Sequence, residues 1–248
     1  MTGRAAERVV PDAVATLAGY GLAALWLLSL APALLVSQLA GLGAGAVVAG
    51  AAAGSLLRRI PRFSTPADRV TLLRAVLIAL CAALAVPQLF TGPRADLLLP
   101  ILGGAAFLLD GLDGAVARRT GTSSPEGARF DSATDAALAL VLSVAAAPVT
   151  GPWTLAIGGM YYTFVAAGFF LPHLRAALPA SASRKAIGAF QPFALLVALL
   201  PGIPLAAAVA APASALALLV FSFARDVVQL ESRHRAVPAD AEAGLSAL

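Results

Sequence analysis

Long apolar segments alternate with short polar links along almost the whole chain. A helix needs about 20 apolar residues to cross the ~30 Å hydrocarbon core of a bilayer, and eight segments come close to that length. They lie at roughly 13–33, 38–57, 70–90, 97–117, 132–150, 153–172, 187–203 and 205–224. The pattern therefore predicts an all-α fold, a polytopic bundle of membrane helices.

The composition agrees with a membrane protein. The chain is 60% hydrophobic and only 12% charged, which excludes an ordinary soluble domain. Its single cysteine, Cys81, lies in an apolar run, so we expect a small buried hydrophobe and neither a disulfide framework nor a zinc site. The net charge of +4 needs no nucleic-acid partner, because membrane topology accounts for the basic residues.

The distribution of charge predicts an orientation. No charged residue occurs between Asp12 and Arg58, so the first two segments form a hairpin whose turn lies between Pro32 and Gly43. If both termini are cytoplasmic, every lysine and arginine except Arg94 falls on the inner side, as the positive-inside rule demands. We expect a multi-pass protein of the cell (plasma) membrane with both termini in the cytoplasm.

Four aspartates interrupt the apolar pattern. Asp110 and Asp113 are three residues apart, and Asp131 and Asp135 are four apart, so each pair shares one face of a helix. The polar link TGTSSPEG lets the two helices fold back as an antiparallel hairpin with all four carboxylates at one end. Carboxylates about 6 Å apart repel each other by roughly 2–3 kcal/mol, so the cluster calls for cations. Oxygen ligands of this kind suit Mg²⁺, Mn²⁺ or Ca²⁺, and such a site predicts phosphoryl transfer.

The residues around these aspartates read D-x-x-D-G-x-x-A-R-x8-G-x3-D-x3-D. This motif resembles, at every defined position, the signature of the CDP-alcohol phosphotransferases, integral membrane enzymes that make phospholipids. Gly114 and Ala117 leave room for a base or a diphosphate to approach the helix, and Arg118 offers a fork for phosphate oxygens. With Gly127, these residues are the expected nucleotide and diphosphate contacts. The alternative for the small residues is close helix packing.

A second segment, RFSTPADRVTLLRAVL, precedes the third apolar run. Its Pro66, Asp68, Thr71 and Arg74 resemble the P-N-x-x-T-x-x-R that opens the core in this family, with Asp68 where Asn is usual. The resemblance makes Asp68 and Thr71 candidate nucleotide ligands. The same residues also mark a helix start, because Pro66 suits a first turn and Asp68 complements the helix dipole.

The resemblance divides the chain into three parts. Residues 64–230 would form the six-helix core, and residues 1–63 an additional N-terminal hairpin that serves packing or dimer support. Residues 231–248 would be a disordered cytoplasmic tail. The resemblance also implies a homodimer.

The implied reaction is displacement at the β-phosphorus of CDP-diacylglycerol by a polar alcohol, with release of CMP. Asp110, Asp113 and Asp131 would hold two ions of Mg²⁺ or Mn²⁺. Asp135 would act as the general base and could also contact a metal.

The sequence indicates the identity of the acceptor alcohol less clearly than it indicates the metal site. Arg175, Arg184 and Lys185 follow the sixth segment and could bind an anionic acceptor, glycerol 3-phosphate or inositol phosphate, or could serve topology alone. The stretch from Lys185 through Gly188 to Gln191 is similar to the K-x-x-T-x-x-Q of phosphatidylglycerophosphate synthases. A transporter that uses intramembrane carboxylates is the alternative class, but it would place them near mid-span.

Overall fold

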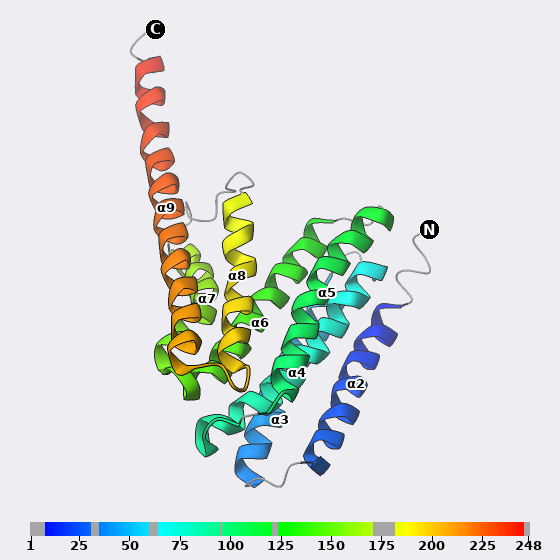
Figure 1. Ribbon diagram of the computed structural model, residues 1–248. Helices are drawn as coiled ribbons and strands as arrows, with labels where there is room; N and C mark the ends of the chain where they lie inside the picture. Colours follow the sequence, from blue (N-terminus) through cyan, green and yellow to red (C-terminus); the bar gives the residue numbers. More distant parts are fainter. Residues whose placement is uncertain are drawn as a thin grey trace.

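The computed structural model describes residues 8–30, 35–59, 64–94, 96–120, 124–170 and 182–245. For residues 28–30, 112–120, 182 and 230–245 it describes the backbone alone. The described part is helical (Figure 1), with α2 Val9–Leu30, α3 Leu35–Leu57, α4 Pro66–Thr91, α5 Leu98–Thr120, α6 Pro125–Thr150, the short 3-10 helix η1 Pro152–Thr154, α7 Leu155–Phe170, α8 Ala182–Leu199 and α9 Leu205–Leu245.

The helices form one bundle with α6 in the middle. Figure 1 shows α2 to α5 on one side of α6 and α7 to α9 on the other. The main core lies where these groups meet, around Ile78, Leu142, Ile157, Leu195 and Leu219. The predicted fold class, a polytopic bundle of helices, is confirmed.

Six of the described helices are long and apolar enough to cross a membrane by length and composition. The other two of the eight expected spans are α5 and α8. In α5 the described side chains form a shorter apolar stretch, Leu98–Gly111, which includes Asp110. The first turn of α8 carries Arg184 and Lys185, which shortens its apolar part.

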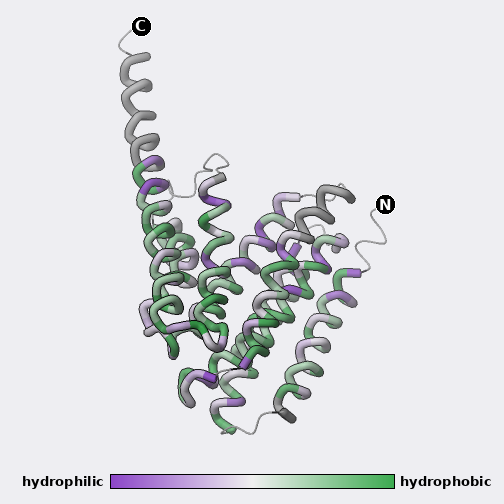
Figure 2. Tube along the Cα trace, viewed as in Figure 1, coloured by the Kyte–Doolittle hydropathy of each residue, from purple (hydrophilic) through white to green (hydrophobic). Residues whose placement is uncertain are grey.

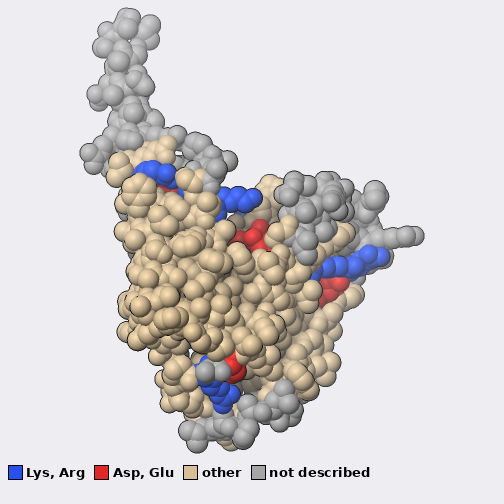
Figure 3. Space-filling model, in the orientation of Figure 1, with Lys and Arg blue, Asp and Glu red and all other residues tan. Residues whose placement is uncertain are grey.

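The outer surface suits a lipid environment. Large apolar side chains point outward, and Phe170 is 85% exposed in the isolated chain. Figure 2 shows hydrophobic residues along the helices and hydrophilic ones near the upper ends of α4, α6 and α8. On the face in Figure 3, charged side chains lie near the upper and lower ends, with a broad uncharged band between them. Such a band matches the hydrocarbon layer of a bilayer.

Polar first turns begin α4 and α6. Thr65 caps α4 through a capping box, in which its hydroxyl accepts from the Asp68 amide at 3.1 Å and Asp68 Oδ2 accepts from the Thr65 amide at 2.8 Å. Ser124 caps α6 and accepts from the Gly127 amide at 3.0 Å. Pro66 and Pro125 occupy the first turns. The predicted helix start at Pro66 is confirmed.

The N-terminal hairpin packs tightly on α4. A side chain at Gly41 would collide with the Ala83 carbonyl, and one at Gly45 would collide with the Ala79 carbonyl. Glycine therefore lets the backbones of α3 and α4 approach closely, which is how helices associate in membranes. The Tyr20 hydroxyl ties α2 to α3 by donating to the Leu42 carbonyl at 2.6 Å.

Helix α9 is longer than its predicted span of 205–224. It runs through Leu245, so residues 231–245, expected as a disordered tail, continue the helix. Four of these fifteen residues are alanine, which has high helix propensity, although the stretch also contains Pro238.

Candidate active site

Three of the four aspartates come together between α5 and α6, about two to three turns from the link that joins these helices. Asp110 comes from α5, and Asp131 and Asp135 come from the second and third turns of α6. One carboxylate oxygen from each lies within 4.8 Å of the others. Their side chains are 37–49% exposed, so the cluster is open to solvent. Asp113 lies in the part of α5 where the structure describes only the backbone.

Of the arginine side chains that the structure describes, Arg74 lies at the centre of this cluster. Arg74 of α4 is completely buried. Its Nη2 lies 3.0 Å from Asp110 Oδ1 and also contacts Asp135 Oδ1, while its Nη1 donates to Asp131 Oδ1 at 2.6 Å. Its Nε donates to the Ala106 carbonyl at 3.3 Å, which orients the guanidinium. The planar fork of arginine suits several oxygens at once.

The contacts of Arg74 were not predicted, although the residue belongs to the second motif. A signal was present, because a lone cation inside an apolar span is expensive unless it is paired. Among the side chains that the structure describes here, one positive charge faces three carboxylates, which leaves an excess of negative charge when all are ionised.

The donor set fits a hard divalent cation. Its ligands would be carboxylate oxygens, the chemistry that Mg²⁺ and Mn²⁺ prefer, and the three side chains converge closely enough to share an ion. The remaining negative charge also favours a cation beside Arg74.

The predicted nucleotide and diphosphate residues fall into two sets. Asp113, Gly114, Ala117 and Arg118 lie on the last turns of α5, and their side chains are outside the described part. Gly127 lies in the first turn of α6, where an added Cβ would come 3.2 Å from Ser124 Oγ. Its small size therefore serves the helix cap as well as any ligand.

Asp68 and Thr71 are both buried in the first turns of α4. Besides its capping role, Asp68 accepts from Arg59 at 2.8 Å in a buried ion pair. Thr71 donates to the Ala67 carbonyl at 3.2 Å. These contacts give both residues structural roles, and nucleotide binding by them stays a prediction.

Two of the expected acceptor residues, Arg184 and Lys185, lie at the start of α8, which packs beside the middle of α9. Arg184 contacts Asp226 Oδ2 at 3.3 Å, and Arg225 contacts Asp226 Oδ1 at 3.3 Å. Arg225 also donates to Ser183 at 3.3 Å. Lys185 is exposed, and Arg175 falls outside the described residues. The buried Asp226 was not predicted as a partner, because sequence distance hides its proximity to α8.

The comparisons with known proteins place this geometry in a family. The family model described as CDP-alcohol phosphatidyltransferase matches residues 64–223, more than half of the chain, including Arg74 and all four aspartates. A search of the curated proteins and a search of the solved structures found no match. The chain therefore belongs to the CDP-alcohol phosphatidyltransferase family, membrane transferases of phospholipid biosynthesis that move a phosphatidyl group to an alcohol and generally use a divalent metal.

Proposed function

We propose that the protein transfers the phosphatidyl group of CDP-diacylglycerol to glycerol 3-phosphate and releases CMP. The observation that carries this proposal is the convergence of Asp110, Asp131 and Asp135 within the family match, in the halves of α5 and α6 that adjoin their connecting link. A site at helix ends can accept a water-soluble nucleotide and alcohol while the acyl chains of the donor stay in the bilayer.

The metal ligands follow from the donor set. Asp110, Asp113 and Asp131 would hold two ions of Mg²⁺ or Mn²⁺, and Asp135 is close enough to join them. Bound there, the ions supply positive charge that stabilises the diphosphate and the departing CMP.

Asp135 is the proposed general base. It is the most exposed of the three described carboxylates, with 49% of its side chain accessible. The acceptor oxygen forms a bond to the β-phosphorus, its proton passes to Asp135, and the bond from this phosphorus to the bridging oxygen breaks. The electron pair of that bond leaves with CMP. Arg74 holds the carboxylates in place during this step, because it contacts all three.

The start of α8 supports an acceptor that carries a phosphate. Arg184 and Lys185 lie in one turn, and Asp226 anchors Arg184. A guanidinium held in this way recognises phosphate with little loss of side-chain entropy. Arg175 is a further proposed contact. Inositol phosphate has the same anionic group, so it is the alternative acceptor.

The decisive experiment is a transfer assay. Membranes containing the protein are given labelled CDP-diacylglycerol with glycerol 3-phosphate, inositol phosphate, serine or phosphatidylglycerol, and the lipid products are separated. We expect phosphatidylglycerophosphate and CMP in equal amounts. Products from serine alone, or no product with any of these acceptors, would overturn the proposed acceptor class.

We also propose the membrane in which the enzyme lies and its orientation there. The positive-inside pattern supports a plasma-membrane location with the aspartates and both termini in the cytoplasm. A homodimer remains a prediction from the family resemblance.

A further inference from the structure

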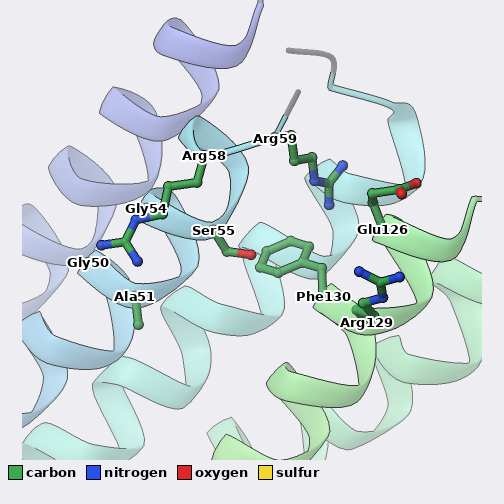
Figure 4. Close-up of a pocket in the computed structure, with 9 residues that line it drawn as sticks. All are labelled: Gly50, Ala51, Gly54, Ser55, Arg58, Arg59, Glu126, Arg129 and Phe130. Carbon is green, nitrogen blue, oxygen red and sulfur yellow. The ribbon is translucent and has the colours of Figure 1, made fainter. Parts of the chain in front are cut away.

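A cavity of about 600 Å³ lies apart from the aspartate cluster, between the last turns of α3 and the first turn of α6. Its volume is within the roughly 300–1,000 Å³ of small-ligand pockets. Figure 4 shows the side chains that surround it. The lining residues are Gly50, Ala51, Gly54, Ser55, Arg58, Arg59, Glu126, Arg129 and Phe130.

The charge of this cavity is predominantly positive. It has three arginines and one carboxylate, that of Glu126. Arg58 and Arg129 are exposed, and neither forms an ion pair with a side chain that the structure describes. Figure 4 shows Arg58 at the end of α3, with its side chain beside Gly54 and Gly50, and Arg129 on α6 at the other side of the cavity. Two guanidinium groups that line one cavity attract an anion.

The third arginine, Arg59, is held in place by contacts on one side of the cavity. Arg59 is buried, donates to Asp68 at 2.8 Å and lies 5.4 Å above the centre of the Phe130 ring. Its contacts hold the end of α3 against α4 and α6. This side of the cavity is therefore preorganised, which reduces the entropic cost of binding a ligand.

Two glycines that line the cavity leave space in it, because they have no side chains. A Cβ at Gly50 or Gly54 would meet nothing within 4 Å. Close helix packing does not explain these glycines, in contrast to Gly41 and Gly45 of the same helix, where a side chain would collide with α4. Ser55 and Glu126 add polar groups that can bond to hydroxyls of a ligand.

We propose that this cavity binds the phosphate group of a hydroxyl-bearing phosphoester, such as a phosphoglycerol headgroup. Arg58 and Arg129 contact the phosphate, and Ser55 and Glu126 contact the hydroxyls. The cavity is distinct from the transfer site, because Arg129 is two positions before Asp131 and so projects from a different face of α6. Membrane topology alone requires arginines at helix ends but no space between them.

Two kinds of variant separate binding from surface charge. Arg58→Gln combined with Arg129→Gln removes the proposed phosphate contacts. Gly54→Leu fills the cavity without altering charge, and it favours the helix. The matched controls are Arg8→Gln, which removes a charge at the same end of the bundle, and Gly43→Leu, which adds a side chain to α3 where it meets nothing within 4 Å. Neither control residue lines the cavity.

Two probes distinguish the source of the phosphoester. Phosphatidylglycerol is offered in phosphatidylcholine nanodiscs, and lipids retained by the protein are counted by native mass spectrometry. Glycerophosphoglycerol, the same headgroup without acyl chains, is titrated by calorimetry. We expect the arginine double variant and Gly54→Leu each to lower affinity for at least one probe by roughly tenfold or more, with both controls near wild type.

The pattern of losses assigns the ligand. Cavity-dependent binding of phosphatidylglycerol alone identifies a lipid site, and such binding of glycerophosphoglycerol as well identifies a site for the headgroup itself. Equal affinity of wild type and Gly54→Leu for both probes would refute the proposal, even if the arginine variant binds more weakly. An Arg8→Gln loss as large as that of the double variant would also refute it, because general surface charge would then explain binding.

Discussion

Substitution of Arg74 tests whether this buried cation offsets the repulsion among the carboxylates of the aspartate cluster. We expect Arg74→Gln to destabilise the protein in chelator, because the variant leaves three carboxylates together without their buried cation. At a separation of 4.8 Å, two carboxylates repel each other by about 3.5 kcal/mol at an effective dielectric constant near 20. Removing one partner of a buried ion pair typically costs about 3–5 kcal/mol. Because the carboxylates are 37–49% exposed, water screens the repulsion, and we take the lower end, about 3 kcal/mol.

The assay is thermal unfolding of the purified protein in detergent, with chelator or with Mg²⁺. A loss of about 3 kcal/mol should lower the melting temperature by roughly 6–12 °C in a chain of this size. Arg69→Gln is the matched control on the same helix. Arg69 lies 3.1 Å from Asp12 but is 45% exposed, so its loss should cost only about 0–1 kcal/mol.

Mg²⁺ should then raise the melting temperature of Arg74→Gln more than that of wild type, since the variant lacks the competing cation. Equal melting temperatures of Arg74→Gln and Arg69→Gln in chelator would show that repulsion among the three carboxylates does not destabilise the protein. No effect of Mg²⁺ on the melting temperature of either protein would mean that the carboxylates do not share a metal, and equal increases would mean that Arg74 does not compete with the metal.

Four further outcomes are expected. Activity should disappear in chelator and return with Mg²⁺ or Mn²⁺; full turnover without metal would contradict the metal site. Asp135→Asn should lower turnover by about 10²–10⁴-fold with near-normal CDP-lipid binding, whereas Asp131→Asn should weaken that binding, as measured with labelled donor. Arg184→Gln should raise KM for the phosphorylated acceptor more than for CDP-diacylglycerol; equal changes would favour a purely topological role. Gly158→Leu should lower the melting temperature markedly, because the new side chain would collide with the Leu140 backbone, whereas Gly159→Leu should not, since its Cβ meets nothing within 4 Å.

For α4 and α6, hydropathy located the C-terminal ends well and the starts less well. The predicted third and fifth segments end within a residue of Thr91 and Thr150. Glycines with positive φ follow directly, Gly92 at 86° and Gly151 at 110°, and break the helix there. The same helices begin four and seven residues earlier than expected, at Pro66 and Pro125, because their capped first turns are polar and do not register as apolar sequence.

The aspartates could be predicted because their geometry is local. Spacing within each helix and a short polar link suffice to bring Asp110 beside Asp131 and Asp135. Arg74 could be named from its motif, but its position between these carboxylates depends on how α4 packs against both helices. The pairing of Arg184 with Asp226 likewise depends on α8 lying beside α9. Which residues of separate helices become neighbours depends on tertiary packing, and the periodicity of apolar residues along the chain does not predict it.

The close approach of the N-terminal hairpin to α4 has a consequence for where the enzyme can be cut. A chain trimmed to the family match at residues 64–223 would lose Arg59, the ion-pair partner of Asp68, and Asp12, which accepts from Ser64 at 2.6 Å. It would also expose to lipid the face of α4 that now meets Gly41 and Gly45. Since α4 carries Arg74, the first two helices support the end of α4 that contacts the aspartate cluster, and a stable fragment of this protein must extend beyond the residues that the family model matches.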